Sequence, residues 1–213
     1  MTVRRGLVAL GDSITRGRGG APALGVHPQS WALWLAEALE LPVTILGVDG
    51  AQAADVLRDQ VPRLQGPYDL ATLFVGANDA RSADFDTAAF ERDTDAILDA
   101  LELHAAEVLV LTVPEDLGRP RAGADVLTVN RVLHARARRV CTLEDFKGRR
   151  VMLPDAVHPT SAGMVAIADR ALAALGSDRR CQADERDDLV ARARYAAWYA
   201  RQELRDRRRR RAG

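Results

Sequence analysis

Short apolar runs alternate with longer stretches of helical periodicity along most of this chain, and no other feature constrains its fold as much. Such alternation is typical of βα units, whose strands lie parallel in one central sheet. We therefore expect a three-layer α/β/α domain, in which helices cover both faces of a parallel sheet of about five strands. The apolar runs predict strands over Leu7–Leu10, Val43–Leu46, Ala71–Val75, Val108–Val113 and Arg139–Leu143. The stretches between them predict helices over Trp31–Leu39, Ala53–Leu64, Thr87–His104 and Val126–Ala137, and a last one runs from Thr160 or Ser161 to about Leu175.

Length and composition fit a globular domain. A chain of 213 residues is long enough for one α/β domain and short for two. Hydrophobic residues make up 47% of the sequence, and the formal net charge is +0. Because positive and negative charges balance, the overall charge gives no reason to expect a nucleic acid or an acidic membrane as a partner, and we expect no nucleic acid.

The start of the chain and its cysteines bear on the compartment. Residues Val3-Arg4-Arg5 lead directly into the first predicted strand, which does not resemble a signal peptide. No apolar run approaches the roughly 20 residues that a transmembrane helix needs. Cys141 and Cys181 show neither metal-binding nor redox spacing. We therefore expect a cytoplasmic protein without a transmembrane segment, whose thiols are reduced.

The last part of the chain differs from the rest. Residues Gly176-Ser177-Asp178 mark a stop, so we expect a domain over residues 1–178 and a basic helical extension over residues 179–213. The extension is predicted to be helical from Glu185, with small and aliphatic side chains three and four residues apart, aromatic residues beside them and arginines on another face. It can pack on the domain or fray, or it can contact a partner, such as a second copy, or a membrane surface.

One serine stands where open α/β sheets build their sites. Ser13 lies in the run Gly11-Asp12-Ser13-Ile14-Thr15, just after the first predicted strand, and so at the carboxyl edge of the sheet. A serine hydroxyl needs a base to take its proton as it attacks a carbonyl carbon. His158, in the run Asp155-Ala156-Val157-His158-Pro159, has a side chain suited to that task. Asp155 precedes it by three positions and can orient the imidazole if the segment turns.

Two further motifs complete a family pattern. They are Gly47-Val48-Asp49-Gly50 and Gly76-Ala77-Asn78-Asp79, and each follows a predicted strand. Together the four motifs resemble those of the SGNH hydrolases, the GDSL-type esterases and lipases, over Leu7 to Leu175. The resemblance implies a flavodoxin-like fold and hydrolysis of a small-molecule carboxylic ester through an acyl-serine, without a metal or organic cofactor. It also implies a catalytic triad of Ser13, His158 and Asp155, and an oxyanion hole formed by the backbone N–H groups of Ser13 and Gly50 with the Asn78 amide. Asp49 departs from the family, which often has a small or hydroxylic residue there.

Each of these residues has another interpretation. Ser13 could cap a helix, His158 could be a surface histidine and Gly50 a turn glycine, while Asp12 and Asp79 are interpreted as structural. Arg16 and Arg18 could be solvated or could meet an anionic group of a substrate. A phosphate-binding loop is not favoured, because the glycines between Gly11 and Gly20 lack the required lysine and spacing. An acyltransferase or thioesterase on the same scaffold stays open, as does a non-catalytic binding or assembly protein that self-associates through the terminal helix.

Overall fold

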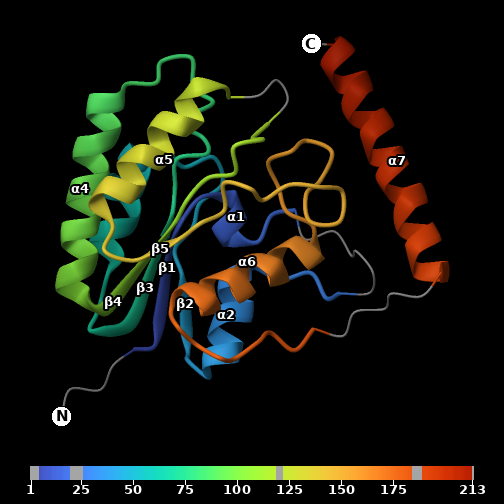
Figure 1. The fold of residues 1–213 in the computed structure, drawn as a ribbon. Helices are drawn as coiled ribbons and strands as arrows, with labels where there is room; N and C mark the ends of the chain where they lie inside the picture. The colour runs from blue at the N-terminus through green and yellow to red at the C-terminus, as the bar shows by residue number, and fades with distance from the viewer. Residues whose placement is uncertain (1–4, 20–25, 119–121, 184–188, 213) are drawn as a thin grey trace.

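The computed structural model describes residues 5–19, 26–118, 122–183 and 189–212, and their strands form one sheet. The strand order is β2-β1-β3-β4-β5, and every neighbouring pair is parallel (Figure 1). This confirms the predicted sheet, and the order is that of flavodoxin-like folds. The strands are β1 (Leu7–Gly11), β2 (Val43–Ile45), β3 (Tyr68–Phe74), β4 (Ala105–Leu111) and β5 (Val140–Cys141).

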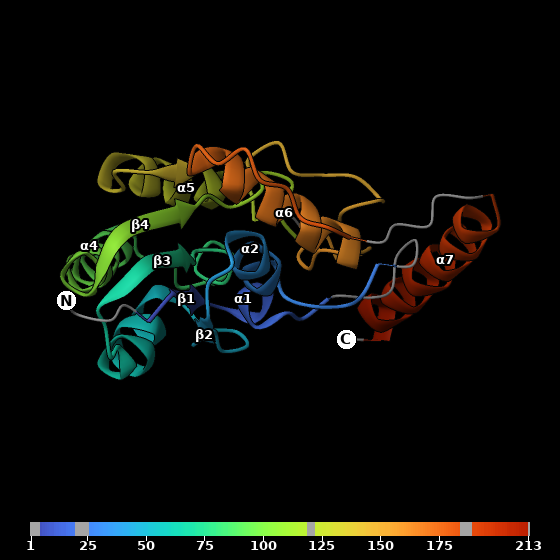
Figure 2. The same cartoon turned by 90° about the horizontal axis from the view of Figure 1, so that it is seen from below.

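Helices cover both faces of the sheet, as predicted, because alternate residues of each strand point to opposite sides. Leu7 and Ala9 of β1 belong to a core under α2 (Trp31–Leu39) and α6 (Ser161–Ala174). Val8 and Leu10 belong to the opposite core. That second core lies under α3 (Ala53–Asp55), the π-helix η1 (Val56–Gln60), the 3₁₀-helix η2 (Val61–Arg63), α4 (Thr87–His104) and α5 (Ala124–Arg136) (Figure 2).

Several boundaries differ from the prediction. Both β3 and β4 begin three residues earlier than the apolar runs indicated, since Tyr68 already pairs with Ala105. At the edge of the sheet, β5 has only two residues, fewer than the predicted strand Arg139–Leu143. The stretch predicted as one helix over Ala53–Leu64 divides into α3, η1 and η2. Pro62 explains the division, because it lacks the N–H that an α-helix would pair with the carbonyl of Arg58.

The terminal helix α7 (Leu189–Ala212) follows the last helix of the sandwich and belongs to neither of its two helical layers. In Figure 2 the strand arrows point toward the side of the molecule where α7 lies, so this helix stands beyond the carboxyl edge of the sheet. The predicted start at Glu185 falls outside the described residues. Among the helices described, none combines the length and the apolar character needed to cross a bilayer.

Candidate active site

Ser13 is placed by the junction between a strand and a short helix. β1 ends at Gly11, and α1 (Ser13–Arg16) begins two residues later. Asp12 between them is the N-cap, and its Oδ1 accepts a hydrogen bond from the Ile14 N–H at 2.8 Å. Ser13 is therefore not the cap, and its hydroxyl points elsewhere, with the residue only 7% exposed. As the first residue of α1, it also has an N–H without an acceptor in its own helix.

The hydroxyl of Ser13 meets the imidazole of His158. Ser13 Oγ lies 3.1 Å from His158 Nε2, and His158 Nδ1 lies 2.7 Å from Asp155 Oδ2. These three side chains, far apart in sequence, thus form one hydrogen-bonded line at the carboxyl edge of the sheet. Since an ionised Asp155 only accepts hydrogen bonds, Nδ1 carries the proton and Nε2 is left to accept from the serine hydroxyl.

The segment that carries Asp155 and His158 folds back on itself. Met152 and Pro159 form an antiparallel bridge, and the Leu153 N–H donates to the His158 carbonyl at 2.9 Å. Between the two site residues, Ala156 has a φ of 55°, which is uncommon for a residue other than glycine. This turn brings the carboxylate and the imidazole, three positions apart, to the same side.

Asp155 is held as a charged group. Its Oδ1 accepts hydrogen bonds from the N–H groups of Val157 and His158 at 2.9 and 3.0 Å. Burial alone would raise the pKa of Asp155, but these bonds and the one from the His158 side chain together lower it. The carboxylate is therefore ionised at neutral pH and suited to stabilise a protonated imidazole.

The Gly47–Gly50 loop lies directly against α1. A Cβ on Gly47 would stand 2.9 Å from the Asp12 carbonyl oxygen and 3.0 Å from the Arg16 nitrogen, so only glycine allows this close approach. Gly50 has a φ of 77°, and a Cβ there would meet nothing within 4 Å. The Gly50 backbone therefore borders open space, which a substrate could enter.

Asp49 in this loop pairs with two arginines that follow Ser13. Arg18 Nε lies 2.6 Å from Asp49 Oδ2, and Arg16 Nη1 lies 3.6 Å from the same oxygen. Both arginine side chains are largely exposed. The unusual aspartate thus links the segment after α1 to the loop after β2, and the two arginines have a protein partner in addition to solvent.

Asn78 lies at the site, but both of its amide protons are engaged. Its Nδ2 lies 3.2 Å from Asp12 Oδ2 and 3.1 Å from the Ala51 carbonyl oxygen. Both partners are oxygen atoms, which supports the assignment of nitrogen to this side of the amide. Donation to a third oxygen would require the amide to release one of these two bonds.

Asp12 is a second carboxylate beside Ser13 and, unlike Asp155, it is buried. Burial raises its pKa to about 6, although the hydrogen bond from the Ile14 N–H and the nearby His158 act in the opposite direction. Its carboxylate links the cap of α1 to the amide of Asn78. This agrees with the structural interpretation of Asp12, since its contacts are with groups that hold the site in place.

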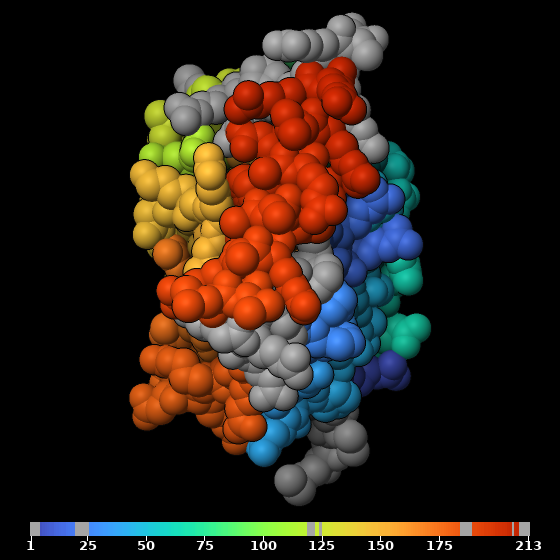
Figure 3. All heavy atoms as spheres, turned by 90° about the vertical axis from the view of Figure 1, so that its right-hand side faces the viewer, coloured from blue at the N-terminus to red at the C-terminus, as the bar shows by residue number. Residues whose placement is uncertain are grey.

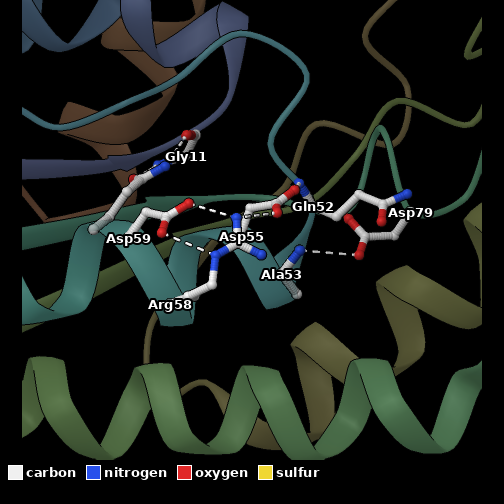
Figure 4. Close-up of polar contacts among 8 residues, drawn as sticks. Gly11, Gln52, Ala53, Asp55, Arg58, Asp59 and Asp79 are labelled. Carbon is white, nitrogen blue, oxygen red and sulfur yellow. Dashed lines mark hydrogen bonds and ion pairs between the residues drawn. The ribbon is translucent and has the colours of Figure 1, made fainter.

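Asp79 also has a structural partner. Its Oδ1 accepts a hydrogen bond from the Ala53 N–H at 3.0 Å, at the start of α3 (Figure 4). Burial raises the pKa of Asp79 as well. On the outer side of the same segment, Arg58 lies between Asp55 and Asp59 (Figure 4). The motif residue Asp79 thus joins the Gly76–Asp79 loop to α3.

Sequence reasoning missed Gln60, which fixes the end of β1. Gln60 is buried, its Oε1 accepts from the Gly11 N–H at 3.0 Å, and its Nε2 donates to the Gly11 carbonyl at 2.8 Å. The Gly11 backbone lies directly beside this helical segment (Figure 4). The only signal in the sequence is one glutamine on a helical stretch, and nothing there indicates that it faces inward.

The described part of the chain holds no arrangement of side chains suited to bind a metal ion. In residues 5–19, 26–118, 122–183 and 189–212, no group of three His, Cys, Asp or Glu side chains is arranged to hold a metal ion. His134, outside the site, pairs with Glu144 at 2.6 Å.

Solved structures resemble the whole sandwich. The acetylxylan esterase Axe2 from Geobacillus stearothermophilus matches with a TM-score of 0.60 and 17% identity, over 82% of this chain and 95% of its own. LAE5, an alpha/beta hydrolase enzyme from the metagenome of Lake Arreo, Spain, matches with a TM-score of 0.61 and 22% identity, over 81% of this chain and 95% of its own. An extracellular lipase from Streptomyces rimosus matches with a TM-score of 0.57 and 23% identity, over 80% of this chain and 98% of its own. A search of curated proteins found no match. At these identities the likeness shows a shared α/β/α fold class.

The match of this sequence to a known protein family shows which family the chain belongs to. Residues 9–166 match the GDSL-like Lipase/Acylhydrolase family. The chain belongs to this family, which confirms the resemblance drawn from its four motifs. The match lies within the predicted domain of residues 1–178 and ends before α7.

Proposed function

We propose that this protein hydrolyses carboxylic esters through an acyl-serine intermediate formed on Ser13. The observation that carries the proposal is the unbroken line from Ser13 Oγ through His158 to Asp155, with separations of 3.1 and 2.7 Å. A nucleophile, a base and a group that orients the base are the three parts that acyl transfer to a serine requires. Membership of the GDSL-like family supports the same chemistry.

In the first half of the reaction, Ser13 Oγ attacks the ester carbonyl carbon as its proton passes to His158 Nε2. Asp155 stabilises the imidazolium through Nδ1–H. The carbonyl oxygen becomes an oxyanion, which the N–H groups of Ser13 and Gly50 and the amide of Asn78 would bind. The C–O bond to the alcohol then breaks, and the imidazolium returns its proton to the leaving oxygen.

In the second half, water replaces the alcohol. His158 Nε2 takes a proton from the water as its oxygen attacks the acyl carbon, and the same oxyanion donors act again. The bond between Ser13 Oγ and the acyl carbon breaks, and Oγ regains a proton from the imidazolium. The products are a carboxylic acid and an alcohol, and the enzyme returns to its starting state.

Asn78 has a defined part in this proposal. Because its two amide protons are directed to Asp12 and Ala51, it would exchange one of these bonds for a bond to the oxyanion. Catalytic hydrogen bonds are often formed only in the complex with substrate, so this arrangement is compatible with the role. Asn78 then stabilises the transition state more than the bound ester, which is the condition for faster turnover.

The solved relatives suggest where to begin the search for a substrate. Two of them are described as an acetylxylan esterase and a lipase, and both names denote enzymes that cleave ester bonds. We therefore infer that acetyl and longer acyl esters are the first classes to test.

Hydrolysis of p-nitrophenyl acetate and of longer p-nitrophenyl esters by the purified full chain tests the proposal. We expect measurable turnover, and we expect Ser13→Ala to reduce kcat by at least about 10³-fold. An added alcohol acceptor distinguishes hydrolysis from acyl transfer, because transfer would yield a new ester. Turnover that is unchanged in Ser13→Ala would refute the proposal.

A further inference from the structure

The terminal helix α7 has one face that packs on the body of the protein. Tyr199 is buried, and the Arg149 guanidinium lies 5.5 Å from the centre of its ring. Tyr195 stacks on Trp198 with 5.7 Å between ring centres, and its hydroxyl donates to the Arg149 carbonyl oxygen. These aromatic contacts determine which side of the helix faces the solvent.

The opposite face of α7 is aliphatic and exposed. Leu189, Val190 and Leu204 have exposed fractions of 82%, 59% and 56%. They continue a row of small side chains three and four residues apart, so all lie on one side of the helix. We call this row the outward stripe, and it consists of Leu189, Val190, Ala193, Ala197, Ala200 and Leu204. A surface helix normally turns such a stripe toward the core, whereas α7 turns it away.

Arginines flank the outward stripe. Arg194, Arg201 and Arg205 each follow a residue of the stripe by one position, which places them about 100° around the helix, and all three are exposed. Residues 189–212 contain nine arginines and two acidic residues, a net charge of +7. Because the whole chain is formally neutral, the remaining residues carry a net charge of −7. Charge is therefore strongly separated between α7 and the rest of the protein.

We propose that α7 docks this protein on an anionic lipid surface. A helix lying in the membrane interface places its aliphatic side chains at the boundary of the acyl chains and its arginines among the phosphates. The outward stripe and its flanking arginines meet both needs on one exposed face. The acidic remainder is repelled by the same surface, so the protein would bind only through α7.

Charge favours a lipid surface over a second copy of the chain. Two copies that paired through their outward stripes would bring helices of charge +7 together, which is unfavourable. A nucleic acid would satisfy the arginines but has no apolar surface for Leu189, Val190 and Leu204. An anionic bilayer matches both the charge and the apolar stripe.

The place of α7 gives the docked protein an orientation. Figure 3 shows α7, in red, across one side of the molecule, between the yellow-orange segments and the blue segments of the sandwich. This is the side toward which the parallel strands point in Figure 2, and Ser13 follows the end of β1. Docking through α7 would therefore turn the carboxyl edge of the sheet, with Ser13 and His158, toward the membrane.

Binding of the full chain to lipid vesicles tests the proposal. We expect flotation with phosphatidylcholine vesicles that contain phosphatidylglycerol, weaker flotation as salt is added and none with pure phosphatidylcholine. Leu189→Gln combined with Leu204→Gln should lower the partition coefficient at least about tenfold. The matched control is Leu103→Gln with Leu127→Gln, which changes leucines that are 84% and 53% exposed on α4 and α5 and should leave binding unchanged.

A second pair of variants tests the charge. Arg194→Gln, Arg201→Gln and Arg205→Gln should together weaken binding about 100-fold, at about fivefold for each arginine near the surface. Arg63→Gln, Arg92→Gln and Arg131→Gln remove the same charge from exposed positions away from α7 and should change binding much less.

Three results would overturn the proposal: no binding to anionic vesicles, equal binding to pure phosphatidylcholine, or equal effects of the α7 variants and their controls. Size-exclusion chromatography supplies a further one. A dimer that dissociates in the Leu189→Gln, Leu204→Gln variant, without vesicle binding by the native chain, would assign the stripe to self-association. Hydrolysis of a dissolved ester is measured separately, so failure here leaves the proposed esterase activity standing.

Discussion

Two carboxylates belong to the site around Ser13, and they differ both in burial and in their hydrogen-bond donors: Asp12 is buried, whereas the Asp155 side chain is 36% exposed. Asp155 accepts hydrogen bonds from two backbone N–H groups and from His158, and its pKa is lowered. Asp12 accepts from the Ile14 N–H and the Asn78 amide, and burial raises its pKa to about 6. Deeper burial with fewer backbone donors raises the pKa of Asp12, whereas partial exposure with more donors lowers that of Asp155. One supports the base of the proposed reaction, and the other holds an oxyanion donor.

The largest expected effect comes from the carboxylate beside the base. Asp155→Asn keeps the size of the side chain but can donate to Nδ1, which favours the imidazole tautomer that cannot accept from Ser13. We expect kcat to fall by about 10⁴-fold with little change in KM. Steady-state kinetics on a p-nitrophenyl ester measures this, with circular dichroism as the control for folding. A fall of less than tenfold would mean that Asp155 does not orient the base.

A second variant tests Asn78, the proposed oxyanion donor that Asp12 holds. Asn78→Ala removes one proposed oxyanion donor and should lower kcat by about 10²–10³-fold. KM should change little, because the bond is formed mainly in the transition state. If KM rises while kcat is unchanged, Asn78 binds the substrate rather than the oxyanion.

A third variant tests the hydrogen bonds between Gln60 and the backbone of Gly11, the residue before Asp12. Gln60→Leu leaves the buried Gly11 N–H without its side-chain acceptor, while the Gly11 carbonyl keeps the hydrogen bond from the Val48 N–H. The loss should cost about 1–3 kcal/mol in the free energy of unfolding. Gln65→Leu, at an exposed position just after η2, removes only a solvent-exposed hydrogen bond from Arg5 and should change stability by no more than about 0.5 kcal/mol. Urea denaturation of both variants measures the difference, and equal stabilities would show that the Gly11 contact is dispensable.

The last effect depends on pH and concerns Asp12 itself. An acid with a raised pKa binds its proton more tightly in the folded state, so its protonation favours folding between the unfolded pKa near 4 and the folded value of about 6. Stability is lost as the pH rises through this window. Asp12→Asn does not titrate, so its stability relative to the native chain should increase from pH 4 to pH 7 by up to about 3 kcal/mol. Parallel profiles of unfolding free energy against pH would contradict the raised pKa.

The sequence predicted the parts of this site that depend on short motifs and strand ends. Parallel strands all end at one edge, so the motifs after β1, β2 and β3 had to meet there, and the turn between Asp155 and His158 is local. The sequence could not predict that both protons of Asn78 are engaged, because that depends on the contact of three separate loops.

The errors in the fold have two causes. The division of the helix at residues 53–64 follows from Pro62, a local feature of the sequence. Gln60 lies at the end of the π-helix η1, a geometry that the pattern of apolar residues does not indicate. The early start of β3 and β4 is set by pairing between neighbours and not by apolar character, since Asp69 and Glu107 lie within these strands. Strand pairing therefore set the strand boundaries, whereas a single local residue divided the helix.

Reaction with a serine-directed organophosphonate, followed by mass spectrometry of the intact chain and its peptides, tests the central claim most directly. The account predicts one added phosphonate group on Ser13 and complete loss of ester hydrolysis in the labelled protein. It also predicts that Ser13→Ala is not labelled, and that His158→Ala is labelled much more slowly than the native chain. Labelling of a different residue with loss of activity, or full activity after Ser13 has been modified, would contradict it.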